Sequence, residues 1–72
     1  MGKPKKYIRY HKDGSIWAKG WMNGATMVGA WIWYRKDGTK LRAGRFSNGK
    51  QIGEWVTYDQ KGLIHKVTRM KE

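Results

Sequence analysis

The sequence predicts an all-β protein, an antiparallel β-hairpin meander of about six strands, and three observations lead to this fold class. Landmark residues return every 24 positions, as Tyr10, Tyr34 and Tyr58 do, and as Trp31 and Trp55 do. Short turn signals that contain glycine separate runs rich in β-forming residues. No segment has both the length and the period of about 3.6 residues that a helix needs. A chain of this kind folds as consecutive hairpins, in which each strand pairs with its predecessor.

The glycines follow the same repeat with one exception. Asn23-Gly24 is matched one position late by Asn48-Gly49, which indicates a residue gained before that turn and lost after it. Turns tolerate such compensation, whereas strands do not, because a slip of one residue turns every side chain to the other face. The glycines that keep the 24-residue interval are Gly14, Gly38 and Gly62; Gly20 and Gly44; and Gly29 and Gly53.

The chain begins with a segment that has little to bury. Residues 1–6 contain three lysines and the one proline, and they are predicted to form a flexible basic N-terminal arm. The remainder, 7–72, is predicted to be a single domain, because a chain this short makes one small core. Its repeat units are 10–33, 34–57 and a partial unit at 58–72.

Each predicted strand ends at a turn signal. Asp-Gly at 13–14 and at 37–38 favours a two-residue type I′ turn, since aspartate and glycine both accept the positive φ that its two centres need. The turn at 60–62 lacks this aspartate and has the weakest signal of the five. The predicted strands are 7–11, 15–22, 29–35, 39–46, 51–58 and 63–70.

Strict alternation along each strand assigns the side chains to two faces. Gly20 and Gly44 lie in mid-strand, where the ring of Tyr34 or Tyr58 on the same face is expected to lie flat over the backbone. Both faces are apolar in places, so the sheet must twist, roll or pair with another chain, and self-association through an apolar face is one way to cover it. The other face is predicted to carry all five tryptophans together with Arg9, Lys19, Arg35, Arg45 and Arg69.

Positive charge dominates the composition. The chain has 16 lysines and arginines against 5 aspartates and glutamates, a formal net charge of +11. Such a field attracts polyanions, which include nucleic acid, an acidic protein surface and an anionic membrane. Membrane attachment is disfavoured because no amphipathic helix is expected, and no apolar run reaches the roughly 20 residues of a membrane span. A soluble, cytoplasmic protein is predicted.

The sequence offers little for catalysis or metal binding. The absence of cysteine excludes disulfides, zinc-thiolate sites and cysteine nucleophiles. Asp13, Asp37 and Asp59 stand in or beside turns, where aspartate usually shapes the backbone. His11 and His65 are far apart, with no second type of ligand near either. The chain is therefore predicted to be no enzyme and to hold no metal and no cofactor.

The tryptophans divide into two groups. Trp31 and Trp55 recur at the repeat interval and are predicted to form the core. Trp17, Trp21 and Trp33 do not recur, which makes them the better candidates for contact with a partner. The predicted partner-binding residues are Arg9, Trp17, Lys19, Trp21, Trp33, Arg35, Arg45 and Arg69.

The motif Tyr-x-x-Asp-Gly-x5-Gly, followed by Asn-Gly and by Gly-x-Trp-x-x-Tyr, resembles the MORN repeat, and specifically its bacterial variant in small antitoxin-type repeat proteins. The match covers about residues 7 to 70. The resemblance implies a non-enzymatic array of β-hairpins used for protein or lipid contact. This chain departs from the pattern because it is very short and strongly basic, so no binding residue is carried over. The residues that carry the resemblance are Tyr10, Asp13, Gly14, Gly20, Asn23, Gly24, Gly29, Trp31 and Tyr34, and again Asp37, Gly38, Gly44, Asn48, Gly49, Gly53, Trp55 and Tyr58.

Two functions are consistent with this sequence. In the first, the protein is a binding module that holds an acidic partner protein and inhibits or neutralises it, as an antitoxin does. In the second, the same Trp/Arg/Lys face binds nucleic acid directly, with tryptophans stacking on bases and cations neutralising phosphates.

Overall fold

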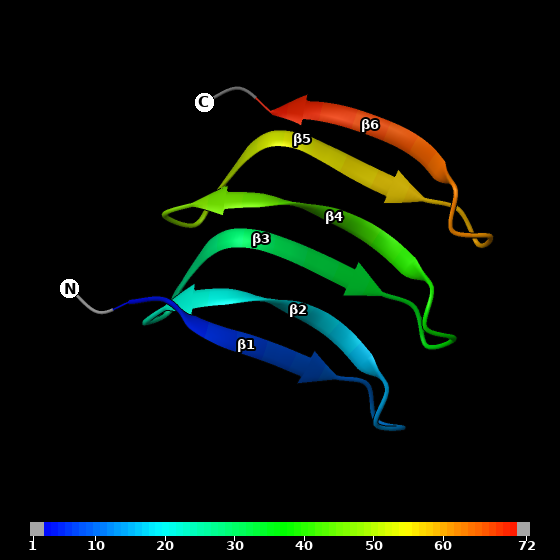
Figure 1. Cartoon of the computed structure of the whole chain (residues 1–72), viewed down its shortest axis with the longest axis horizontal. Helices are drawn as coiled ribbons and strands as arrows, with labels where there is room; N and C mark the ends of the chain where they lie inside the picture. Colours follow the sequence, from blue (N-terminus) through cyan, green and yellow to red (C-terminus); the bar gives the residue numbers. More distant parts are fainter. Residues whose placement is uncertain (1–2, 71–72) are drawn as a thin grey trace.

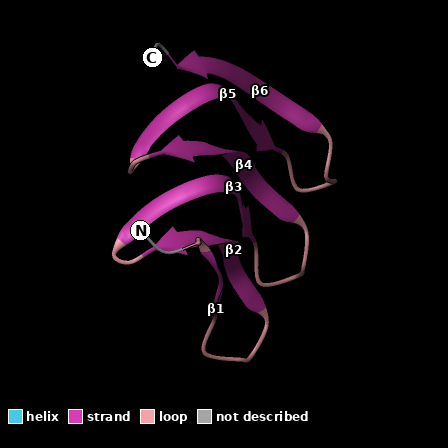
Figure 2. Cartoon of the chain, turned by 60° about the vertical axis from the view of Figure 1, so that its left-hand side comes forward, coloured by secondary structure: helices cyan, strands magenta, loops and turns pink. Residues whose placement is uncertain are grey.

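The computed structural model describes residues 3–70 as one antiparallel sheet (Figure 1). The strands lie side by side in the order in which they occur in the chain, and each is hydrogen-bonded to its predecessor. The predicted all-β meander is therefore confirmed. The molecule measures 39 × 31 × 13 Å, and its shortest dimension is the thickness of a single layer. Figure 2 shows the strands bent into arches. The strands are β1 (Lys5–Tyr10), β2 (Ile16–Asn23), β3 (Thr26–Tyr34), β4 (Lys40–Ser47), β5 (Lys50–Tyr58) and β6 (Ile64–Met70).

The N-terminal arm is shorter than the sequence predicts. Lys5 and Lys6 belong to β1 and pair with Met22 and Trp21 of β2. The predicted arm at 1–6 is therefore wrong for these two lysines, and its first two residues lie outside the described part of the chain. Within residues 3–70, no helix is present that could cross a membrane.

The 24-residue spacing of the repeat is kept through the turns that join β2 to β3 and β4 to β5. These turns are centred on Gly24-Ala25 and on Asn48-Gly49, which are 24 residues apart, so the expected gain and loss of a residue is wrong. Only Gly24 has a positive φ in the first turn, 63°, as in type II′. Asn48 and Gly49 have φ of 49° and 81° in the second, as in type I′. The two copies therefore use different turn types at one position.

The turns at the other end of the sheet are three-residue loops. Gly14 has a φ of 92°, while Asp13 does not take a positive φ, so the predicted type I′ turn is wrong here. The Gly14 N–H donates to His11 O at 3.0 Å, and the His11 N–H donates to Ser15 O at 2.7 Å. This is a type I turn followed by a glycine bulge, and the extra residue changes which face the next strand presents.

Aspartate fixes each of these turns by accepting hydrogen bonds. Asp13 Oδ1 accepts the Ser15 N–H at 3.0 Å, and Asp37 Oδ1 accepts the Thr39 N–H at 2.9 Å. In the third turn Asp59, four residues before Leu63, accepts the Leu63 N–H at 3.0 Å in the same way. The turn predicted to lack an aspartate therefore obtains one from upstream.

These contacts lower the pKa of two turn carboxyls. The pKa of Asp13 lies below its ordinary value, first because the Ser15 hydroxyl donates to it and then because the Ser15 N–H does. The Thr39 hydroxyl and N–H lower the pKa of Asp37 in the same order. Since the folded pKa is below the unfolded one, these contacts stabilise the fold fully above the unfolded pKa, and the stabilisation is lost as pH falls through the folded pKa.

We therefore expect the protein to lose stability as the pH falls below about 4, the ordinary range of an aspartate carboxyl. A double variant, Asp13→Asn with Asp37→Asn, keeps an acceptor oxygen but cannot titrate, so its acid-dependent loss should be smaller. Urea unfolding midpoints between neutral pH and pH 2 measure the difference. An identical pH dependence in the two proteins would contradict the assignment.

The core consists of two tryptophans laid over glycines. Trp31 and Trp55 are each 3% exposed, which confirms the sequence prediction for the core. A Cβ added to Gly20 would lie 2.1 Å from Trp31 Cδ2, and one added to Gly44 would lie 2.1 Å from Trp55 Cδ2. Glycine is therefore required because the ring occupies the place of a side chain. Ala18, 2% exposed, and Gly20 are the other buried residues of the described chain.

The sequence predicts the rings of Tyr34 or Tyr58 over these glycines, and this prediction is wrong, because the rings are those of Trp31 and Trp55. Gly29 and Gly53 have φ of 70° and 68°, and the register shifts where the preceding strand passes them. Each bulge brings the tryptophan two residues later onto the glycine of the preceding strand. Tyr58 instead lines the other side of the sheet, with Ala43 and Val56. Strict alternation of side chains along each strand therefore predicts the wrong ring over each glycine.

Candidate partner-binding surface

One side of the sheet, here called the aromatic face, carries Tyr7, Trp31, Trp33, Phe46 and Trp55. Cross-strand pairing defines it, because residues directly opposite each other point to the same side. Tyr7 is opposite Gly20, Trp31 is opposite Gly44, and Phe46 is opposite Gly29. The other side, called the opposite face, is defined by Lys19, Trp21, Ile32, Ala43, Arg45 and Val56.

The rings of the aromatic face pack against one another. Trp33 lies between the two core tryptophans, with ring centroids 5.7 Å from Trp31 and 5.6 Å from Trp55. Phe46 meets Trp55 edge-on at 5.1 Å. Tyr7 extends the group toward β1, with its centroid 5.8 Å from Trp31. Such pairs each contribute about 0.5 to 1.5 kcal/mol beyond the area they bury.

Two arginines on this side of the sheet lie over indole rings. The Arg42 guanidinium is 4.9 Å from the Trp55 centroid and 5.8 Å from the Trp33 centroid. Arg9 is 5.1 Å from the centroid of Trp17, which stands at the irregular end of β2. A cation over an indole is held by its attraction to the ring quadrupole.

The charge of the aromatic face has one sign. Within residues 3–70, the aspartates lie in turns, and Glu54, the one carboxylate within a strand, lies on the opposite face. Glu54 is 2.9 Å from Arg69, an exposed pair that adds little stability. The aromatic face therefore presents cations with no described carboxylate among them. By cross-strand pairing these cations are Lys5, Arg9, Arg42 and Lys66.

The predicted binding residues do not all lie on one face of the sheet. Arg9, Trp17 and Trp33 come together on the aromatic face. The other predicted residues do not join them, and the prediction that all five tryptophans share one face is wrong for Trp21. The bulges explain the error, because each one shifts the alternation by a residue. The residues on the opposite face are Lys19, Trp21, Arg45 and Arg69.

Arg35 is occupied within the fold and does not belong to either face. Its Nη2 donates to Tyr58 O at 2.7 Å, and its Nη1 donates to Asp59 O and to Lys40 O, both at 2.9 Å. His11, 24 residues earlier, makes the corresponding but longer contact to Tyr34 O, 3.3 Å. This repeat position therefore ties each turn to the next.

Sequence reasoning missed Tyr7, Met22, Arg42 and Phe46 as parts of this surface. Tyr7 occupies the repeat position of Trp31, a signal that the sequence contained. Arg42 is directly opposite Trp33 across the β3–β4 ladder, but finding that pairing required the register of a hairpin with a bulged turn.

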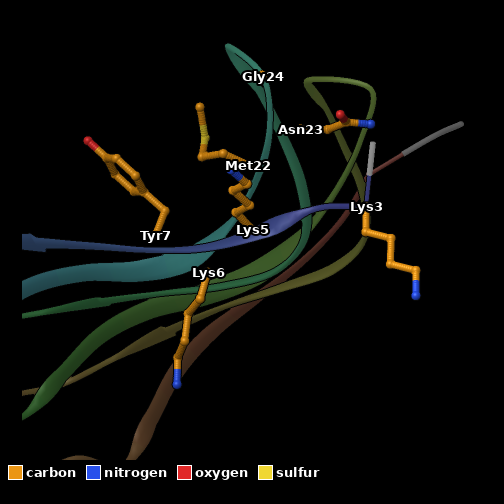
Figure 3. Close-up of a pocket in the computed structure, with 7 residues that line it drawn as sticks. All are labelled: Lys3, Lys5, Lys6, Tyr7, Met22, Asn23 and Gly24. Atoms are coloured by element: carbon orange, nitrogen blue, oxygen red, sulfur yellow. The ribbon is translucent and has the colours of Figure 1, made fainter. Parts of the chain in front are cut away.

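The aromatic face continues to the start of β1 as a hollow of about 560 Å³ (Figure 3). Figure 3 shows Tyr7 and Met22 on one side of the β1 ribbon and Lys6 on the other, as the pairing requires. Lys3 and Lys5 complete its basic wall. The described residues contain no group of three histidine, aspartate or glutamate side chains placed to hold a metal ion.

In comparisons with known proteins, no family model matches this chain, and no curated protein and no solved structure matches it. The likeness to the MORN repeat stays a prediction that rests on the residue spacing.

Proposed function

We propose that this protein is a non-catalytic binding module that holds an acidic polypeptide on its aromatic face, as an inhibitor or neutralising partner of another protein. The observation that carries the proposal is the pairing of exposed rings, Tyr7 and Trp17 at 37% each, with charge of one sign. Tryptophan and arginine are the side chains most enriched where proteins bind tightly. Here Arg9 and Arg42 lie over indole rings with no described carboxylate on the same face.

The charge also selects the kind of partner. A second copy of this chain would bring the same cations, Arg9 and Arg42 among them, against themselves, and like charges across an interface are unfavourable. An acidic chain would gain ion pairs with the outward donors of the guanidiniums and contact with the half-buried Trp33. The aromatic face therefore favours an acidic partner over self-association.

Direct nucleic-acid binding has less support on this surface. Base stacking needs a free ring face, and Trp31 and Trp55 are each 3% exposed. Trp33 has a tryptophan neighbour on each side and Arg42 above it. The cations would still attract phosphates, but through contacts that salt weakens steeply.

A pair of arginines on one strand provides the test. Arg42 and Arg45 both lie on β4, on the aromatic face and the opposite face respectively, so Arg42→Gln and Arg45→Gln remove the same charge from different sides. We expect Arg42→Gln to weaken binding of a ten-residue glutamate-rich peptide about threefold to tenfold, and Arg45→Gln to change it much less. Fluorescence titration at moderate salt gives both affinities, and circular dichroism checks the fold.

The same titration includes single-stranded RNA and heparin. The proposal predicts that peptide binding survives moderate salt with one peptide per protein, whereas binding of the other two fades. RNA that binds more tightly than the peptide at moderate salt would overturn the proposal, and so would equal losses in the two variants.

A further inference from the structure

A second, smaller hollow opens on the aromatic face between β1 and β3. Its volume is about 280 Å³, below the range of pockets that hold drug-sized ligands. Tyr7, Trp17 and Trp33 form aromatic parts of its lining, while Met22 and Met27 contribute flexible thioethers. Methionine adapts its shape to a guest and is common on surfaces that receive apolar side chains.

The repeat shows what occupies the corresponding place in the second unit. In the second unit Phe46 takes the place of Met22, and its ring lies 6.1 Å from Trp31 and 5.1 Å from Trp55, counted between centroids. Arg42 takes the place of the buried Ala18 and covers Trp55. The first unit therefore lacks the phenylalanine and the arginine that fill this place in the second unit.

The charge around the hollow points to the nature of its guest. Arg9 is the charged residue in the lining, and no carboxylate lines it. The basic hollow of Figure 3 adjoins it, because Tyr7 and Met22 line both. An apolar side chain in the smaller hollow would thus place neighbouring carboxylates beside Arg9 on one side and beside Lys5 on the other.

We infer that this hollow is an anchor site for one aromatic or large aliphatic side chain of an acidic polypeptide. The inference rests on the proposed function, of which it names the specificity element. The guest's apolar group contacts Met22, Met27 and Trp33, and the carboxylates on either side of it pair with Arg9 and Lys5.

Two peptides test the anchor. One is a ten-residue glutamate-rich peptide with a single central phenylalanine, and the other has alanine at that position. We expect the phenylalanine peptide to bind the wild-type protein about tenfold more tightly, since burial of such a ring contributes roughly this factor. This comparison needs no variant. Equal affinities of the two peptides would overturn the anchor site while leaving the proposed function standing.

Substitutions that copy the second unit locate the anchor. Met22→Phe fills the hollow with the ring that the second unit uses, and should bring the phenylalanine peptide down to the affinity of the alanine peptide. Met27→Phe narrows the hollow from β3 and should do the same. A preference for phenylalanine that persists in both folded variants would overturn the assignment to this hollow. If neither peptide binds the wild-type protein, the proposed function itself fails, and the anchor site fails with it.

Discussion

Replacing Gly20 with alanine is expected to destabilise the protein by about 3 kcal/mol or more, the upper range for inserting atoms into a packed site. The new Cβ would lie 2.1 Å from Trp31 Cδ2 and 2.3 Å from Cε2, so either the ring or the β2 backbone must move. A chain of this length has a net stability of only about 3 to 5 kcal/mol. The variant should therefore be largely unfolded at 25 °C, and Gly44→Ala should behave alike.

Gly62→Ala separates this collision from the backbone preferences of glycine. No atom lies within 4 Å of the Cβ position of Gly62, but its φ is 84°, which costs an alanine about 1 to 2 kcal/mol. Near-ultraviolet circular dichroism and urea midpoints should rank Gly20→Ala and Gly44→Ala well below Gly62→Ala. Stabilities of Gly20→Ala and Gly62→Ala that are equal would show that the rings do not rest on these glycines.

Replacing Arg35 with alanine is expected to lower the free energy of unfolding by about 2 to 3 kcal/mol, since hydrogen bonds to charged groups are worth about 1.5 to 3 kcal/mol each and water partly replaces them. The guanidinium holds three backbone carbonyls, of Lys40, Tyr58 and Asp59, at 2.7 to 2.9 Å. Arg35→Lys should not restore the loss, because an ammonium group lacks the planar fork that reaches separate carbonyls. Urea unfolding measures both variants.

Two other positions serve as controls for Arg35, one next to it in the chain and one at the equivalent place in the preceding repeat unit. Lys36 is exposed in the same turn, and Lys36→Ala should stay within about 0.5 kcal/mol of the wild type. His11→Ala loses one contact of 3.3 Å and should cost about 0.5 to 1 kcal/mol. A loss at Arg35 no larger than that at Lys36 would contradict this role and leave Arg35 free to contact a partner, as the sequence alone predicts.

The fold could be predicted because its determinants are local. A 24-residue repeat and glycine at each turn specify hairpins whose order follows the chain, and the six strands occur where the turn signals leave room for them. The repeat also identified Trp31 and Trp55 as core, since a side chain kept at the same place in both units packs against the same neighbour.

The face of each side chain could not be predicted, because one bulge reverses the alternation that follows it. Gly29 and Gly53 bend their strands at positive φ, and the three-residue turns add one more residue each. Trp21 therefore lies on the face opposite Trp33, although strict alternation placed them together. The choice between a protein and a nucleic-acid partner depends on whether the tryptophan rings are free to stack on bases. The bulges decide this as well, because they determine which rings pack against one another.

The most direct test of the central claim, that the aromatic face is the binding surface, is a two-dimensional ¹H–¹⁵N spectrum of the indole N–H groups during titration with the glutamate-rich phenylalanine peptide. Trp17 and Trp33 line the anchor hollow, while Trp21, 41% exposed on the opposite face, is an internal control. The resonances of Trp17 and Trp33 should shift in proportion to bound peptide, and that of Trp21 should stay in place. Bound peptide that shifts Trp21 and leaves Trp17 and Trp33 unchanged would contradict the claim.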